Sequence, residues 1–157
     1  MRIKHIMTKE PACCVPSDTA QRAACIMRDE HAGIVPVIED AQARKLMGVV
    51  TDRDLCMNVV AEGRDPGGVT VQQSMTTKVV TCSPNDSVDR ATELMRENQI
   101  RRIPIVNEQR ELVGILAMAD IVTRGDIKMN QMHETLKKVS APAREPSKPR
   151  AQSRKAA

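Results

Sequence analysis

The sequence contains no Phe, Trp or Tyr among its 157 residues. A hydrophobic core must therefore be built from aliphatic side chains, Ala, Cys and the ten Met residues, whose flexible thioethers fill irregular gaps. The missing rings also exclude the aromatic stacking platforms that hold single-stranded nucleic acids. The composition of 41% hydrophobic and 28% charged residues is nevertheless typical of a folded domain.

Long apolar runs are missing as well, since nothing approaches the ~20 residues that a membrane span requires. The first ten residues, MRIKHIMTKE, lack the apolar stretch of a secretory signal. The five Cys residues are odd in number and show no CxxC spacing, which argues against a disulfide framework or a zinc site. We therefore expect reduced thiols, a cytoplasmic protein, no membrane contact and no metal ligands.

The excess positive charge lies at the C-terminus. Residues 141–157 contain five basic side chains and one acidic side chain, which accounts for the whole net charge of +4. The neutral remainder argues against nucleic-acid binding by the folded part. The tail is rich in Pro, Ala and Ser, and we predict that it is disordered. Contact between this tail and nucleic acid or an acidic partner remains a weaker alternative.

The chain is an internal repeat. At an offset of 68 residues Met7 matches Met75 and Pro36 matches Pro104, and at an offset of 66 Asp54 matches Asp120. Each unit predicts the order β-α-β-β-α, with hairpins over 34–50 and 102–116. A unit of about 60 residues has a marginal core, so we expect the two units to pack as a pseudo-twofold pair.

The predicted fold class is α/β, with two β-α-β-β-α repeats, a C-terminal helix and a disordered basic tail. The predicted divisions are repeat 1 at 1–62, a linker at 63–70, repeat 2 at 71–126, a helix at 127–140 and the tail at 141–157. First strands are expected at 12–15 and 79–82, and Asp18 and Asp86 are expected to cap the helices that follow. Pro36 and Pro104 cannot donate to a strand ladder and should lie at sheet edges or bulges.

Two short motifs in each repeat resemble the nucleotide-binding signature of cystathionine-beta-synthase-type (CBS) repeats. That signature reads G-h-x-h-P and then h-h-G-h-h-[ST]-x-x-D, where h is apolar. The first repeat carries Gly33-Ile34-Val35-Pro36 and Gly48-Val49-Val50-Thr51-Asp52-Arg53-Asp54. The second carries Arg101-Arg102-Ile103-Pro104 and Gly114-Ile115-Leu116-Ala117-Met118-Ala119-Asp120.

The resemblance implies a regulatory module that binds AMP, ADP, ATP or a related adenosyl ligand in clefts between paired repeats. It also implies a flat homodimer and an effector protein outside this chain. No catalytic residue, metal or required cofactor is expected. The alternative is a non-catalytic dimerisation protein with empty clefts. The sequence does not choose among AMP, ADP, ATP, S-adenosylmethionine, NAD or another nucleotide.

The residues of the first repeat suit such a ligand chemically. Thr51 and Asp54 lie on one face at a helix start, where free N–H groups favour phosphate. Asp54 can accept two ribose hydroxyls, and the Thr51 hydroxyl and Arg53 can donate to a phosphate. The same Thr-x-x-Asp pattern is also an ordinary helix cap.

The hairpin entry of the first repeat would hold the base. Gly33 allows close approach of the backbone, and Ile34 and Val35 can form an apolar wall beside Pro36. Without aromatic rings, adenine would lie between aliphatic side chains.

The second repeat departs from the signature. Ala117 removes a hydroxyl donor and Arg101 replaces the glycine, whereas Asp120 can still hold a ribose. Arg101 and Arg102 should point to opposite faces of a strand, so that at most one meets a given ligand. Their alternative role is a charged edge that discourages aggregation. We expect one functional cleft and one degenerate cleft.

Overall fold

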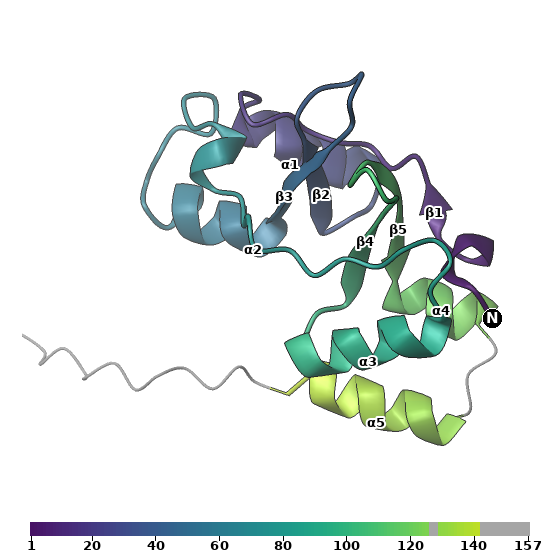
Figure 1. Cartoon of the computed structure of the whole chain (residues 1–157). Coiled ribbons are helices and arrows are strands. Elements are labelled where there is room, and N and C mark those ends of the chain that lie inside the picture. Colours follow the sequence, from purple (N-terminus) through teal and green to yellow (C-terminus); the bar gives the residue numbers. More distant parts are fainter. Residues whose placement is uncertain (126–128, 142–157) are drawn as a thin grey trace, which may run out of the picture.

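The computed structural model describes residues 1–125 and 129–141, and it contains the predicted repeat of helices and hairpins (Figure 1). The mixed α/β order runs η1 (Ile3–His5), β1 (Thr8–Lys9), α1 (Ala20–Asp29), β2 (Ile34–Ile38), β3 (Leu46–Thr51), α2 (Asp52–Leu55), η2 (Cys56–Val60), η3 (Val71–Gln73), α3 (Val88–Asn98), β4 (Arg102–Val106), β5 (Leu112–Ala117), α4 (Met118–Arg124) and α5 (Met129–Val139).

The residues that cap α1 and α3 are not the predicted Asp18 and Asp86. Helix α1 is capped by Thr19, whose hydroxyl accepts from the Arg22 N–H at 3.1 Å, and α3 is capped by Ser87 in the same way. Asp18 lies one residue too early and accepts from the Val15 N–H at 2.9 Å. Asp86 likewise accepts from the Ser83 N–H, so each Asp closes the turn that leads into the helix.

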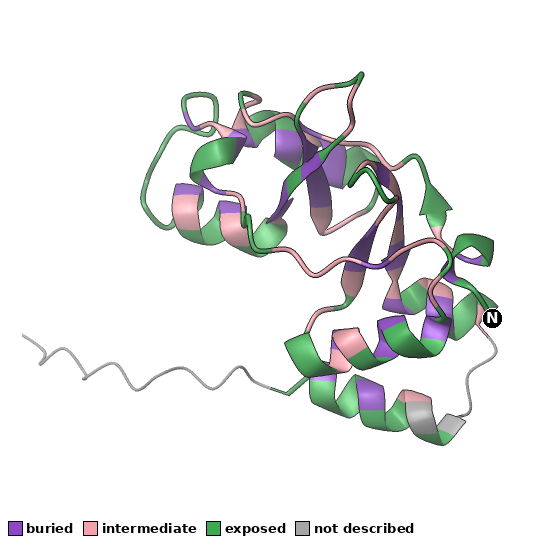
Figure 2. Cartoon of the chain, in the orientation of Figure 1, coloured by how far each residue is buried: buried purple, intermediate pink, exposed green. Residues whose placement is uncertain are grey.

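Each hairpin has one face in the core of its repeat and one face toward the other repeat, because side chains alternate along a strand. Val35 and Val37 of β2 lie in the core of the first repeat, and Ile103 and Ile105 of β4 lie in that of the second. The opposite faces meet in a third cluster, between the hairpins, whose buried members are Ile38, Leu46 and Leu112. Figure 2 shows this concentration of buried residues on the strands and on the inner helix faces.

Both prolines occupy edge strands, as expected. Strand β2 pairs only with β3 in its sheet, and β4 lies at one end of the order β1-β5-β4. The predicted first strands at 12–15 and 79–82 are reduced to single parallel bridges, Cys14 to Val37 and Cys82 to Ile105.

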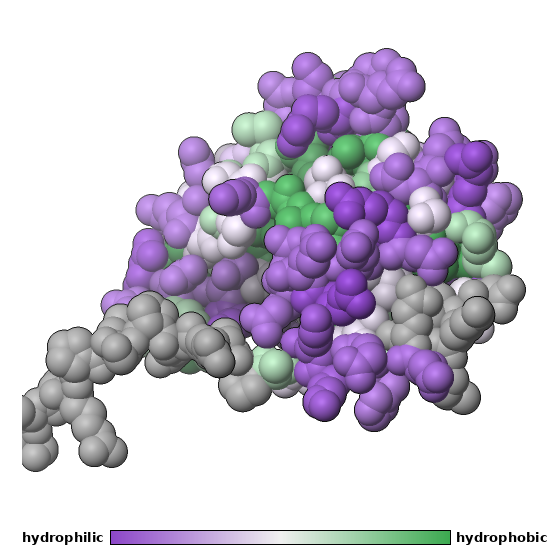
Figure 3. Space-filling view, turned by 60° about the horizontal axis from the view of Figure 1, so that its bottom comes forward, coloured by the Kyte–Doolittle hydropathy of each residue, from purple (hydrophilic) through white to green (hydrophobic). Residues whose placement is uncertain are grey.

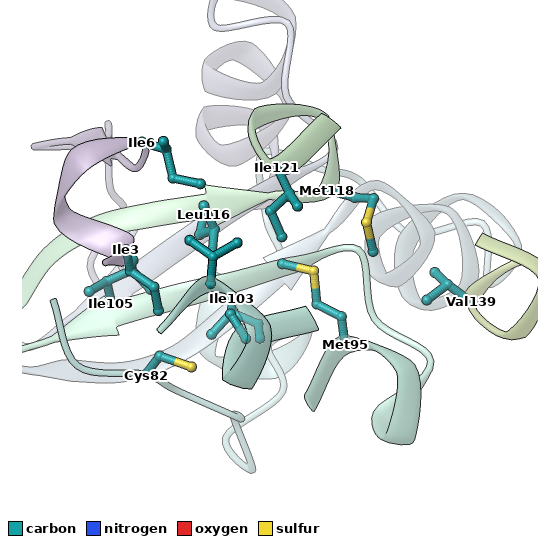
Figure 4. Close-up of a cluster of buried hydrophobic side chains, with 12 residues drawn as sticks. Ile3, Ile6, Cys82, Met95, Ile103, Ile105, Leu116, Met118, Ile121 and Val139 are labelled. Carbon is teal, nitrogen blue, oxygen red and sulfur yellow. The ribbon is translucent and has the colours of Figure 1, made fainter. Parts of the chain in front are cut away.

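The segment that precedes each repeat in the sequence packs against the other repeat. Ile3 and Ile6 are buried in the core of the second repeat, where Figure 4 shows them beside Leu116 and Ile105. Strand β1 pairs with β5 through Thr8 and Ile115. In return, residues 69–76 enter the first repeat: Val69 and Val71 lie in its core, and Thr76 bridges Val49 of β3.

Helix α5, within the predicted C-terminal helix, packs along α3 (Figure 1). Thr135 and Val139 are buried, whereas Leu136 is 44% exposed. The start of the predicted helix at 126–128 and the predicted disordered tail from 142 onward lie outside the described residues. No helix within residues 1–125 and 129–141 is long and apolar enough to cross a bilayer.

The exchange of segments makes the N-terminus a stability element of the second repeat. Because Ile3 is fully buried, Ile3→Ala should lower the free energy of unfolding by about 2–5 kcal/mol. Urea denaturation followed by far-ultraviolet circular dichroism measures the change. The control Val60→Ala, at a residue 73% exposed, should stay within about 0.5 kcal/mol of the parent. Equal stability of both variants would contradict the buried position of Ile3.

Candidate functional site

Two clefts lie between the repeats, and each combines parts of both. The larger has a volume of about 620 Å³ and joins the start of α2 to the residues that lead into β4, with Thr51, Asp54, Lys78, Gln99 and Arg101 among its lining. The smaller has a volume of about 210 Å³ and joins the start of α4 to the residues that lead into β2. Thr8, His31, Ala117 and Asp120 line this smaller cleft. The two sets correspond through the internal repeat.

A capping box orders the predicted phosphate and ribose residues of the larger cleft. The Asp54 carboxylate accepts from the Thr51 N–H at 2.9 Å and from the Thr51 hydroxyl at 2.7 Å, while the Asp54 N–H donates to that hydroxyl at 3.1 Å. The two contacts to the carboxylate both use one oxygen, Oδ2. Within the described residues, Oδ1 of Asp54 makes no hydrogen bond, so it can accept from a ligand hydroxyl. The helix cap and ligand roles of this pair are therefore compatible.

Positive charge predominates around the larger cleft. Its charged lining consists of four cations, Arg53, Lys78, Arg101 and Arg102, and of two carboxylates, Asp52 and Asp54. The expected alternation of Arg101 and Arg102 along a strand is not observed, because Arg101 belongs to the bend before β4. Both residues line this cleft.

Gly33 creates room where the two repeats approach. A Cβ atom at this position would lie 2.8 Å from Oδ2 of Asp52 and 3.4 Å from Nη1 of Arg102. A side chain at position 33 would therefore collide with the Asp52 carboxylate. The Gly33 carbonyl also accepts from the Asp52 N–H at 3.1 Å, which ties the hairpin entry to the first turn of α2. In the second repeat the Arg101 carbonyl makes the equivalent bond to the Met118 N–H at 2.8 Å.

The smaller cleft is less suited to anions. Asp120 accepts from the Ala117 N–H at 2.9 Å, which reproduces half of the capping box of the first repeat, but Ala117 has no hydroxyl to complete it. Arg124 lies 3.9 Å from the other oxygen of Asp120. Glu30 adds a second carboxylate to the lining, and the side chain of Arg102 also reaches this cleft.

The repeated sequence, the paired clefts and the two hairpins agree with one family. A sequence model of the CBS domain matches residues 3–61 and again 70–126. The chain belongs to the CBS domain family.

Relatives of this CBS pair cover most of it. The chain is 41% identical over 130 residues to the CBS domain-containing protein YhcV of Bacillus subtilis. The aligned region covers 83% of this chain and 85% of that protein. It resembles the crystal structure of the CBS domain pair of protein MJ0100 in complex with 5′-methylthioadenosine and S-adenosyl-L-methionine, at 26% identity and a TM-score of 0.69 over 78% of this chain and 93% of that one. It also resembles CBSX2 in complex with AMP, at 25% identity and a TM-score of 0.66 over 77% and 93%.

Two predicted CBS site residues do not present their side chains to a cleft. Val35 and Ile103 are buried in the cores of their own repeats, because they occupy the inward face of β2 and β4. The prediction that the Val35 side chain forms the wall is therefore wrong, and only its backbone remains for a ligand. Ile34 and Pro36 do line the smaller cleft, while Ile34 and Pro104 line the larger one.

Several lining residues lie outside the signature and were not predicted from the sequence. Lys78 belongs to the segment before α3, and Gln99 and His31 follow the ends of α3 and α1. Gln99 and His31 share a left-handed backbone, with φ of 53° and 50°. Such conformations concentrate at functional sites. Their equivalence at the offset of 68 is the signal that could have paired them.

The cysteines and carboxylates of this CBS pair do not assemble a metal site within the described residues. All five thiols are free. Burial raises the pKa of Cys14 to about 12, helped by the nearby Asp18 carboxylate, and burial raises the pKa of Cys82 to about 11. Both thiols therefore stay protonated near neutral pH, which fits their position as small core residues.

The raised pKa values predict selective alkylation. At pH 8 iodoacetamide should modify exposed Cys56 well before Cys14 or Cys82, because the thiolate is the reacting species and the two buried thiols hold their protons. Mass spectrometry of timed digests measures the three rates. In urea at the same pH the rates should converge. Rapid native labelling of Cys14 would contradict its burial.

Proposed function

We propose that this CBS pair senses an adenosine nucleotide of the AMP, ADP and ATP class in its larger cleft. CBS domain pairs are regulatory ligand-binding modules, and structural relatives hold AMP or adenosyl compounds. The main support for the proposal is that one cleft of about 620 Å³ contains both four cationic side chains and the Asp54 carboxylate, which has an oxygen free to accept a hydrogen bond. A phosphate and a ribose present the matching groups.

The phosphates would lie among Arg53, Lys78, Arg101 and Arg102. Three separate segments contribute these side chains: the start of α2, the segment before α3 and the entry to β4. Guanidinium groups bind phosphate through paired hydrogen bonds, and Lys adds a point charge. The excess of cations favours phosphorylated ligands over S-adenosylmethionine, whose sulfonium is itself positive.

The ribose and the base would occupy the inner part of the cleft. Asp54 Oδ1 would accept from a ribose hydroxyl while Oδ2 keeps the capping box intact. Ile34, Val80, Ile100 and Pro104 supply aliphatic surface for adenine. Thr51 would donate to phosphate only if its hydroxyl turned away from Asp54.

The output of the sensor would be a change in assembly or in contact with a separate effector protein. Met57, Val60 and Val122, on η2 and α4, are each more than half exposed. Apolar side chains on corresponding helices of the two repeats suit a homodimer interface. We propose a cytoplasmic, non-catalytic homodimer in which ligand shifts the equilibrium between two arrangements.

The same apolar helices support a second candidate, a dimerisation protein whose clefts stay empty. This alternative predicts that nucleotides leave the thermal stability unchanged. The nucleotide sensor predicts stabilisation, because a ligand that binds only the folded state raises its stability in proportion to the logarithm of its concentration.

Isothermal calorimetry with AMP, ADP, ATP, S-adenosylmethionine and NADH tests the proposal directly, since the chain has no Trp or Tyr for fluorescence. Asp54→Ala should weaken binding of the preferred nucleotide by about 1.5–3 kcal/mol, because it removes a charged hydrogen-bond acceptor.

Asp120→Ala is the matched control. It removes the equivalent cap contact in the second repeat and should leave the affinity of the larger cleft nearly unchanged. Binding of none of the five compounds would overturn the adenosine assignment and favour the dimerisation protein.

A further inference from the structure

Arg102 occupies an unexpected position on the face between the repeats. The alternating face of β2 toward the second repeat presents Ile34, Pro36 and Ile38, all apolar. The corresponding face of β4 presents Arg102, followed by Pro104 and Val106. Arg102 therefore puts a charge where the first repeat has Ile34. Its side chain makes no hydrogen bond or ion pair with any residue in the described part of the chain.

The side chain of Arg102 spans both clefts. Its Cα pairs with Ala117, whose side chain lies on the same face, so the stem leaves the strand in the smaller cleft beside the start of α4. Its guanidinium reaches the larger cleft, where Nη1 lies 3.4 Å from the position of a Cβ on Gly33, beside Asp52. One flexible cation is thus shared by two clefts that open on different helix starts.

The two clefts depend on this cation to different degrees. Without Arg102, the larger cleft still has Arg53, Lys78 and Arg101. Among the described residues that line the smaller cleft, Arg102 is the only Lys or Arg, and Glu30 and Asp120 are carboxylates. His31 adds a third titratable side chain there. Arg124 lies 3.9 Å from Asp120 but outside the lining. An anion in the smaller cleft would therefore need the guanidinium that an anion in the larger cleft attracts.

We propose that Arg102 makes the two clefts antagonistic toward phosphate-bearing ligands, an inference that rests on nucleotide binding by the larger cleft. Phosphate in the larger cleft holds the guanidinium beside Gly33. The smaller cleft then keeps two carboxylates and rejects a second phosphate, while it still admits an uncharged nucleoside. Arg102 would set which ligand pairs can occupy one chain, and the sensor would respond to a nucleotide and to its dephosphorylated product separately.

Calorimetric titrations with AMP and with adenosine test this coupling. The smaller-cleft step is identified as the one that Asp120→Ala removes. Its AMP affinity should be about 10-fold tighter in Asp54→Ala, where the larger cleft is weakened, than in the parent protein with the larger cleft filled. The affinity of the same cleft for adenosine should agree within about twofold in the two proteins, because adenosine carries no phosphate.

Arg102→Ile gives the matched variant, since Ile already occupies the equivalent position 34. When Arg102→Ile is added to the parent and to Asp54→Ala, the difference in the AMP affinity of the smaller cleft should disappear. Competition titrations against adenosine allow weak AMP affinities to be measured. Arg102→Lys, which keeps the charge without the fork of donors, should retain a smaller difference. Thermal melts by circular dichroism check that each variant folds.

The possible outcomes separate the two proposals. Equal AMP affinity of the smaller cleft in both backgrounds overturns the coupling, as does a difference that persists in Arg102→Ile. Absence of AMP binding to the smaller cleft even in Asp54→Ala also overturns it and leaves nucleotide binding by the larger cleft intact. Absence of AMP binding to the parent protein overturns the proposed function itself.

Discussion

Aliphatic packing between the two hairpins is the interaction on which both clefts depend. Ile38, Leu46 and Leu112 are buried between the repeats, and backbone bonds from Leu46 to Arg110 and from Leu112 to Arg44 join the starts of β3 and β5. These contacts lie next to the hairpin turns. Toward the opposite ends of β2 and β4, at Gly33 and Arg101, the repeats leave space for a ligand. A pair of small domains thereby gains a shared core and two clefts from one interface.

The duplication makes the clefts equivalent in position, but point differences make them unequal in chemistry. Thr51 corresponds to Ala117, and Gly33 to Arg101, so the larger cleft gains both a hydroxyl and an extra guanidinium from across the interface. The smaller cleft gains His31 and Glu30 instead. On the face that Figure 3 shows, hydrophobic residues are exposed near the centre and in smaller patches toward the edges, among mostly hydrophilic side chains.

Local patterns predicted the hairpins well and tertiary placement poorly. The two hairpins begin at the predicted residues 34 and 102 and end one residue later than predicted, at the cap residues Thr51 and Ala117. The exchange of Ile3 into the second repeat was not predictable, because its partners lie about a hundred residues away and periodicity reports only local structure. The pairing of Thr51 with Asp54 followed from spacing, whereas Lys78 and Gln99 reach the cleft only through the packing of the repeats.

A crystal structure of the protein with ADP would show directly which cleft binds the nucleotide. The nucleotide should lie in the larger cleft, with a ribose hydroxyl within hydrogen-bond distance of Asp54 and the phosphates among Arg53, Lys78, Arg101 and Arg102. A nucleotide bound only in the smaller cleft, or with its ribose away from Asp54 and its phosphates in solvent, would contradict the proposed site.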